Sequence, residues 1–212
     1  MFIDYLALML INLVAGLVLL AVWTFLDLGS PQQRRWLPGL LMVGIISLFT
    51  GLHMIFTWPL PGAYNIPYGE MSVFFGILML GLSLTLLFDI SLLSVSIYAT
   101  LVGLASILTG IQVINLGMTE SPVLTGTSFI WMGVIGLLTL PMLRLQEILA
   151  ARVLGAVGLL AAAVLWGAIG YVGYWHHLES SFQIWKPLHM EYQIHMNTPR
   201  ANSPAAAPSK AN

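Results

Sequence analysis

The chain of 212 residues has no cysteine and very little charge. The absence of cysteine excludes disulfides, thiolate metal sites and cysteine nucleophiles. Only 7% of the residues are charged, whereas soluble domains contain about 25%, so this composition cannot build a water-exposed surface. The net charge of −1 gives no argument for nucleic acid as a partner, which would need a basic patch, so we expect no nucleic acid among the partners.

Enzyme motifs are also missing. The sequence contains no GxSxG, HExxH, P-loop or dinucleotide fingerprint, and it offers no evident nucleophile–base pair. The sequence therefore leaves enzyme activity open but gives no support for it.

Apolar residues make up 58% of the chain and form six stretches long enough to cross a bilayer, which takes about 20 residues. We predict an all-α polytopic membrane helix bundle. Met1 to Leu28 lacks a positive n-region and is too long for a signal h-region, so it is expected to be a retained first helix. The six helices are expected at 4–28, 36–58, 69–88, 91–115, 124–146 and 152–175.

Two segments of this chain resemble each other. VGIISLFTGLHMI (43–55) and VGLASILTGIQVI (102–114) share six of thirteen residues at an offset of 59. Tyr68-Gly69 and Gly76 then correspond to Thr125-Gly126 and Gly133 at an offset of 57. We predict two tandem helical hairpins, made of helices 2–3 and 4–5. A unit of two helices returns the chain to its starting side, so the repeats are expected to be parallel.

The repeated segments carry polar residues at matching positions. Spacing of i, i+3 and i+6 predicts that each trio lies on one side of its helix. This stripe consists of Ser47, Thr50 and His53 in the first copy and Ser106, Thr109 and Gln112 in the second. Two interpretations are open: a packing seam between helices 2 and 4, or a cavity or solute path between the repeats.

Histidine offers a second hypothesis. Glu70, at the start of helix 3, either caps that helix or lies near His53 at the outer level, where His176 and His177 are also expected. Such a group could bind zinc or copper, or supply axial ligands to haem b. The candidate metal or haem residues are therefore His53, Glu70, His176 and His177.

Basic residues predict the orientation. Arg34 and Arg35 fall in the first loop, and Arg144 and Arg152 near the fifth, so these loops should face the cytoplasm. Asp27, Asp89 and Glu147 lie near them and are expected to form interfacial ion pairs. With six spans, both termini of this cell-membrane protein are expected on the outer side.

We expect the chain to divide into a six-helix transmembrane domain at 1–175, an outer interfacial segment at 176–198 and a disordered tail at 199–212. The stretch from Trp58 to Gly76, following TGLHM at Thr50 to Met54, resembles an uncharacterised family of prokaryotic multi-pass membrane proteins, classed as a domain of unknown function. The resemblance covers roughly residues 1–175. It implies a multi-pass membrane fold and no activity.

Three functions are compatible with these patterns. The first is a small transporter-like unit or a subunit of a larger membrane complex. The second is a haem- or copper-binding redox protein with a site at the outer end of helices 2, 3 and 6. The third is a structural accessory subunit that docks through its C-terminal tail. Expected partners are the lipid bilayer and either further copies of the chain or other membrane subunits.

Overall fold

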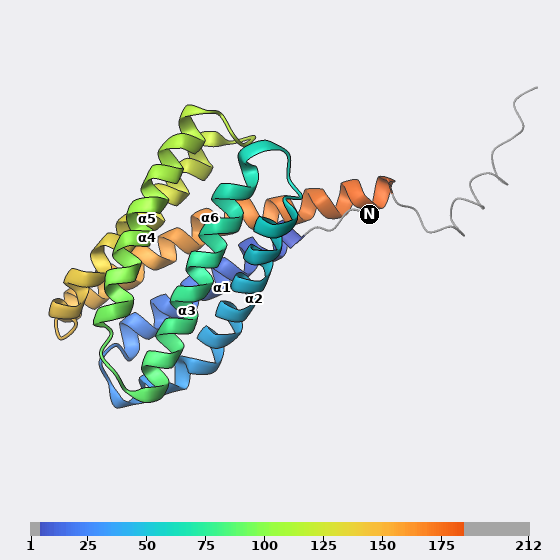
Figure 1. Ribbon diagram of the computed structural model, residues 1–212. Coiled ribbons are helices and arrows are strands. Elements are labelled where there is room, and N and C mark those ends of the chain that lie inside the picture. Colours follow the sequence, from blue (N-terminus) through green and yellow to red (C-terminus); the bar gives the residue numbers. More distant parts are fainter. Residues whose placement is uncertain (1–4, 185–212) are drawn as a thin grey trace, which may run out of the picture.

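The computed structural model describes residues 5–184, and these residues form helices and loops without any strand. This architecture confirms the predicted all-α class. The six long helices are α1 (Tyr5–Leu26), α2 (Leu37–Thr57), α3 (Met71–Phe88), α4 (Leu93–Asn115), α5 (Pro122–Leu145) and α6 (Leu149–Ile184) (Figure 1). Three short turns of helix precede α2 and α3, namely η1 (Pro31–Trp36), η2 (Gly62–Tyr64) and η3 (Ile66–Glu70).

All six helices are long and apolar enough to cross a membrane. The shortest of these spans has 22 residues, which extend about 33 Å at 1.5 Å per residue. The hydrocarbon core of a bilayer is about 30 Å thick, so each helix can span it once.

The helices end where the sequence contains residues that stop a helix. Gly29, with a φ of 78°, follows α1 and precedes Pro31. Trp58 ends α2 in the left-handed region with a φ of 46°, and Pro59 follows it and cannot donate to a further helical turn. These breaks produce the hairpins.

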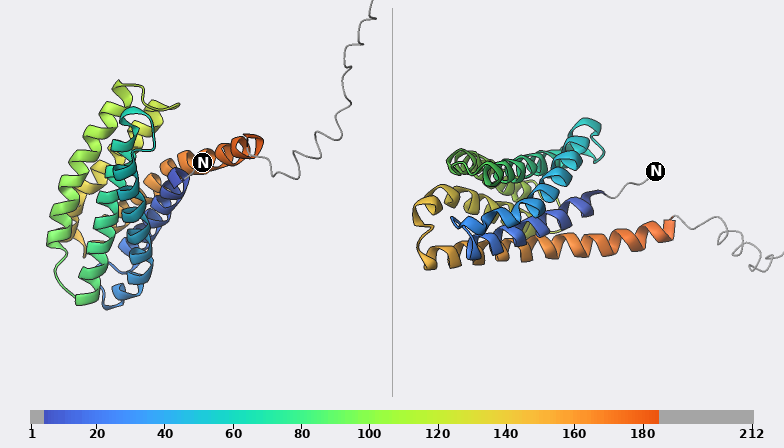
Figure 2. Two further views of the ribbon diagram at one scale, coloured as in Figure 1. Left: turned by 45° about the vertical axis from the view of Figure 1, so that its right-hand side comes forward. Right: turned by 90° about the horizontal axis from the view of Figure 1, so that it is seen from below.

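The helices pack as two hairpins and one pair of terminal helices. α2 packs on α3, α4 packs on α5, and α1 lies beside α6 although the two are far apart in sequence (Figure 2). α1 and α6 are antiparallel, since Gly170 faces Leu10 and Gly155 faces Thr24. α1 also packs against α2, and α6 also packs against α5.

The α1–α2, α3–α4 and α5–α6 loops meet at one end of the bundle. Arg34 forms an ion pair with Asp89 at 3.8 Å, which joins the first of these loops to the second. Gly29 lies beside the side chain of Gln146, which joins the first loop to the third. Loops one, three and five therefore share a side, as the sequence predicts for six spans.

The last helix is longer than its membrane span. α6 runs unbroken past residue 176 to Ile184, and its 36 residues extend about 54 Å (Figure 1). The remainder of the predicted interfacial segment and the whole predicted tail lie outside the described residues.

Candidate functional site

The predicted polar stripe does not stay on one side of α2. Ser47 is buried, Thr50 is half-buried and His53 is exposed. Each step of three residues falls about 60° short of a full turn, so the third residue of a trio is turned by about 120° from the first. Thr50 donates a hydrogen bond to the Ile46 carbonyl of its own helix at 2.7 Å, and His53 packs edge-on against Tyr5 of α1.

The stripe of α4 shows the same arrangement. Ser106 is buried and donates to the Phe129 carbonyl of α5 at 2.7 Å. Thr109 donates to the Ala105 carbonyl of its own helix at 2.9 Å, and Gln112 is exposed. In both copies, only the serine reaches the interior of the bundle.

Glycines bring the two helices of each hairpin together. A Cβ on Gly110 of α4 would lie 2.4 Å from the Gly126 carbonyl oxygen of α5. A Cβ on Gly51 of α2 would lie 2.9 Å from the corresponding carbonyl oxygen, that of Gly69 at the start of the α3 segment. The close packing therefore lies within the hairpins, α2 on α3 and α4 on α5, and not between helices 2 and 4.

These contacts correspond between the hairpins at the offsets of the sequence match. Gly51 faces Val73 in the first hairpin. In the second, Gly110 is 59 residues after Gly51, and it faces Ile130, which is 57 residues after Val73. The pairs Gly44–Leu80 and Gly76–Leu48 correspond in the same way to Gly103–Leu137 and Gly133–Ile107. The correspondence supports a duplicated hairpin, which stays a prediction.

Asn12 of α1 links the first stripe to the rest of the bundle. Its side-chain nitrogen donates to the hydroxyl of Ser47 at 2.8 Å and to the Val43 carbonyl at 3.0 Å. Ser72 of α3 donates to the Ser47 carbonyl at 3.0 Å, so three helices meet at Ser47. The polar stripe predicted from the sequence does not include Asn12. The signal was a single amide in an apolar span, which needs a partner in a membrane.

A cavity of about 240 Å³ lies between the two hairpins and the terminal helices. All six long helices contribute to its walls, which include Leu17, Ser47, Phe75, Val95, Ser106, Met132 and Trp166. Most of its walls are leucine, methionine and aromatic side chains, and none of the described residues that line it is charged. Both stripe serines line it, while Thr50, His53, Thr109 and Gln112 do not.

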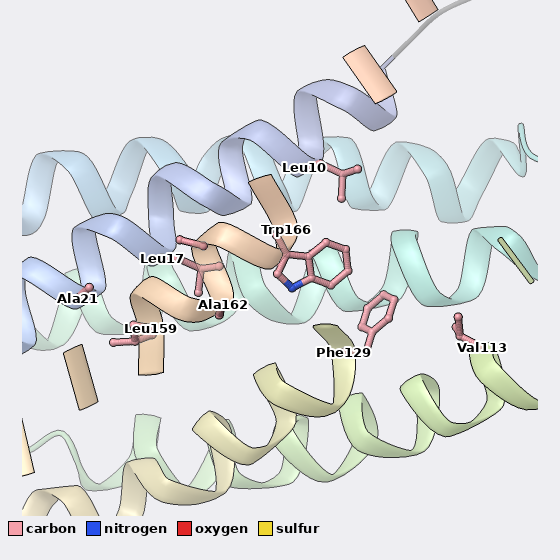
Figure 3. Packing of buried hydrophobic residues seen from close by; sticks show 9 residues of the cluster. Leu10, Leu17, Ala21, Val113, Phe129, Leu159, Ala162 and Trp166 are labelled. Carbon is pink, nitrogen blue, oxygen red and sulfur yellow. The ribbon is translucent and has the colours of Figure 1, made fainter. Parts of the chain in front are cut away.

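Two tryptophans in the cavity wall have unpaired indole nitrogens. Trp166 of α6 is 2% exposed and Trp23 of α1 is 7% exposed, and the Nε1 of each lacks a hydrogen-bond partner. Trp166 packs edge-on against Phe129, with ring centres 4.8 Å apart, in the apolar cluster around Leu17 (Figure 3). A buried indole N–H normally has a partner, so these two donors are unusual.

No hydrogen bond or ion pair joins the predicted metal or haem residues whose side chains the structure describes. Glu70, at the end of η3, makes no side-chain capping bond to α3, and no ion pair joins it to His53 within the described part of the chain. His176 lines a separate hollow with Glu120 and Glu179. The side chain of His177 lies outside the described residues. Among those that are described, no three His, Asp or Glu side chains could hold a metal ion.

The arginine-bearing end of the bundle holds a buried carboxylate. Asp27 is 6% exposed and accepts hydrogen bonds from Arg35 at 2.7 Å and from Trp36 at 2.6 Å. Burial by itself raises the pKa of Asp27, but the bonds from Trp36 and Arg35 and the charge of Arg35 outweigh it, so the pKa lies below its ordinary value.

Arg152 of α6 donates to the last carbonyls of α1, those of Thr24 and Phe25. The expected ion pairs of Asp27 and Asp89 are therefore present.

Comparison with protein families finds one match, to a family model described as "Protein of unknown function (DUF981)". The match covers residues 1–180, which is most of the chain and all six spans. Comparisons with curated proteins and with solved structures find no match.

Proposed function

We propose a function for this chain, which belongs to the DUF981 family of proteins of unknown function: it is a transporter-like membrane protein that binds an apolar molecule between its two hairpins. The observation that carries this proposal is the uncharged cavity of about 240 Å³ at the centre of the bundle. Apolar cavities of about 150 Å³ stay dry and bind benzene or xenon, so a larger one can hold an apolar molecule.

In this proposal, the apolar molecule enters the cavity from the bilayer. α3 and α4 make few contacts with each other compared with the helices inside each hairpin. A molecule that is dissolved in the lipid can therefore reach the cavity between the hairpins without crossing water. The described walls of this site carry no Asp, Glu, His, Lys or Arg side chain.

The orientation belongs to the same proposal. The end that contains Arg34, Arg35, Arg144 and Arg152 faces the cytoplasm, because loops rich in Arg and Lys stay on that side. The N-terminus then lies on the outer side. We take a single chain as the binding unit. A homo-oligomer or a complex with other membrane subunits stays a prediction, which the mass of the protein purified in lipid nanodiscs would test.

Filling the cavity tests the proposed function. Ala99 of α4 is 9% exposed and lines the cavity, whereas Ala150 of α6 is exposed and does not line it. We expect the wild type and Ala150→Leu to bind xenon under pressure, measured by ¹²⁹Xe NMR in nanodiscs, and to retain the same apolar molecule on purification, measured by mass spectrometry. Ala99→Leu should lose at least half of both.

The result that contradicts the proposal is equal xenon binding and equal retention in all three proteins. Circular dichroism and size-exclusion chromatography show whether Ala99→Leu folds. If it does not, Val102→Phe tests the same wall, because Val102 also lines the cavity and is less tightly enclosed than Ala99.

A further inference from the structure

We propose that the ligand of this cavity is a neutral apolar molecule with a carbonyl oxygen, which accepts a hydrogen bond from the indole N–H of Trp166 or Trp23. This inference rests on the proposed function and names the ligand class. It rests on two geometric facts: both tryptophans line the cavity, and both indole nitrogens are buried without a partner.

Three hydroxyls of the cavity wall already have acceptors in the protein. Ser72 donates to the Ser47 carbonyl at 3.0 Å, Ser106 donates to the Phe129 carbonyl at 2.7 Å, and Thr139 donates to the Gly136 carbonyl at 2.6 Å. Among the described residues of the wall, the indole N–H groups of Trp23 and Trp166 are buried donors without a partner. A ligand that satisfies them must supply an acceptor, because an indole nitrogen only donates.

The wall also determines the charge of the ligand. None of the described lining residues carries a charge, so a carboxylate, phosphate or ammonium group would enter without a counter-ion. A ketone, ester or quinone carbonyl is neutral and accepts a hydrogen bond, and the rest of such a molecule can be hydrocarbon. The ring of Phe129, between Trp166 and Tyr68, adds an aromatic surface beside the Trp166 donor.

The two donors lie at different depths of the bundle. Gly170 lies level with Leu10 and Gly155 with Thr24, which places Trp166 near Val14 on the axis of α1. Trp23 is nine residues further toward the cytoplasmic end, or about 14 Å along the helix. A carbonyl can therefore be held near the middle of the membrane at Trp166 and nearer the inner end at Trp23, as expected for a molecule that moves through the cavity.

A matched pair of probes tests the inference in nanodiscs. 5-Nonanone and n-nonane have the same chain length, and only the ketone can accept a hydrogen bond. We expect 5-nonanone to move the indole ¹H–¹⁵N NMR signals of Trp166 or Trp23 downfield, and n-nonane to leave their proton shifts nearly unchanged. Trp166→Phe should weaken 5-nonanone binding by about fivefold and leave n-nonane binding unchanged.

Trp131→Phe is the control variant, because the Trp131 nitrogen donates to the Gly158 carbonyl at 2.9 Å and its ring does not line the cavity. It should bind both probes as the wild type does. If Trp166→Phe does not fold, the wild-type spectra and the binding of both probes to Trp23→Phe still test the inference. Two further probes distinguish the source of the carbonyl: preferential binding of duroquinone indicates a quinone, and preferential binding of methyl octanoate indicates a lipid ester.

The outcomes separate the two proposals. If xenon occupies the cavity but ketone and hydrocarbon bind equally, or if the indole signals show a bond to water that the ketone does not displace, the carbonyl inference is wrong and the apolar cavity stands. If xenon does not bind in the wild type and Ala99→Leu retains the purified molecule as the wild type does, the proposed function is wrong as well.

Discussion

The side-chain nitrogen of Asn12 lies 2.8 Å from the hydroxyl oxygen of Ser47, and this bond joins α1 to α2 in the interior of the bundle. Both side chains are buried, at 8% and 1% exposed. Ser47 in turn lines the cavity, so the contact holds one wall of the candidate site against the terminal helix.

Removing this bond should destabilise the fold. Interhelical hydrogen bonds in membranes contribute about 0.6–2 kcal/mol, so Asn12→Leu and Ser47→Ala should each lower the free energy of unfolding by about that amount. The double variant should lose less than the sum of the two, because both changes remove the same bond. Unfolding in mixed detergent micelles, titrated with SDS, measures all three values.

Thr50→Val is the matched control for this cycle. Its hydroxyl bonds to a carbonyl of its own helix, so its loss should change the free energy of unfolding by less than about 0.5 kcal/mol. Additive effects of Asn12→Leu and Ser47→Ala would contradict the assigned bond.

Gly110→Ala should separate α4 from α5. The added Cβ would lie 2.4 Å from the Gly126 carbonyl oxygen, which is backbone and cannot rotate away. Overpacking of this kind lowers the free energy of unfolding by about 1–3 kcal/mol. Gly158→Ala on α6 is the control, since nothing lies within 4 Å of its Cβ position, and it should be neutral or stabilising. Equal effects of the two substitutions would show that the glycine contact is unimportant.

Asp27→Asn should lower the free energy of unfolding by about 1–3 kcal/mol, because Arg35 loses its charged partner and Asp27 is buried. Asp89→Asn is the control: both side chains of the Arg34–Asp89 pair are mostly exposed, so the change should be less than about 1 kcal/mol. Thermal unfolding of both variants in one detergent provides the comparison, and similar losses would be inconsistent with a structural role specific to Asp27.

The same carboxylate makes stability depend on pH. Its pKa is lower in the folded protein than the ordinary value of 3.8, so its stabilising contribution is complete above about pH 3.8. The contribution is then lost as the pH falls through the folded pKa. Wild type should therefore lose stability below pH 3.8 more steeply than Asp27→Asn. Parallel curves for the two proteins would place the titrating group elsewhere.

The absence of cysteine makes the orientation directly measurable. Gln32→Cys lies in η1 at the arginine-bearing end, and Glu120→Cys lies in the α4–α5 loop at the opposite end. Both positions are exposed. A membrane-impermeant maleimide added to intact cells should label Glu120→Cys and should label Gln32→Cys only after lysis. The reverse pattern would invert the proposed topology.

His53→Ala should leave the cavity intact. His53 is exposed and contacts Tyr5 outside the cavity, so the variant should bind xenon and retain an apolar molecule as the wild type does. Gln112→Ala, at the matching position of α4, should behave in the same way. Loss of binding in His53→Ala alone would place the path of the solute along the outer face of α2.

The sequence was sufficient to predict the six helices to within a few residues for most of their ends. Long uncharged runs, separated by residues such as Gly29 and Pro59, indicate membrane-spanning helices, because a helix satisfies all of its backbone polar groups within one apolar segment. The number of spans was also sufficient to predict that loops one, three and five lie on the same side of the bundle. The end of α6 was not predictable in this way, because its last residues leave the apolar span without a helix-breaking residue.

The stripe was harder to interpret from sequence, because i, i+3 and i+6 spacing drifts around a helix. Ser47 and Ser106 turned inward, whereas His53 and Gln112 turned outward, and only the packing of each hairpin decided which residues faced the cavity. No signal in the sequence indicated the unpaired indoles of Trp23 and Trp166, since tryptophan is common in membrane helices. Whether an indole N–H has a hydrogen-bond partner depends on all the groups packed around it.

Composition and hydropathy thus determined how many helices this protein has and where most of them end, because those properties depend on local residues and on the bilayer. Tertiary structure decided the rest. It placed α1 beside α6 and joined Asn12 to Ser47. It also left a cavity without charged described lining residues between the two hairpins, in each of which glycines bring the two helices close together. Contacts between residues far apart in the sequence, such as those that place α1 beside α6, carry no periodic signal in a single sequence, and the cavity needs walls from all six long helices.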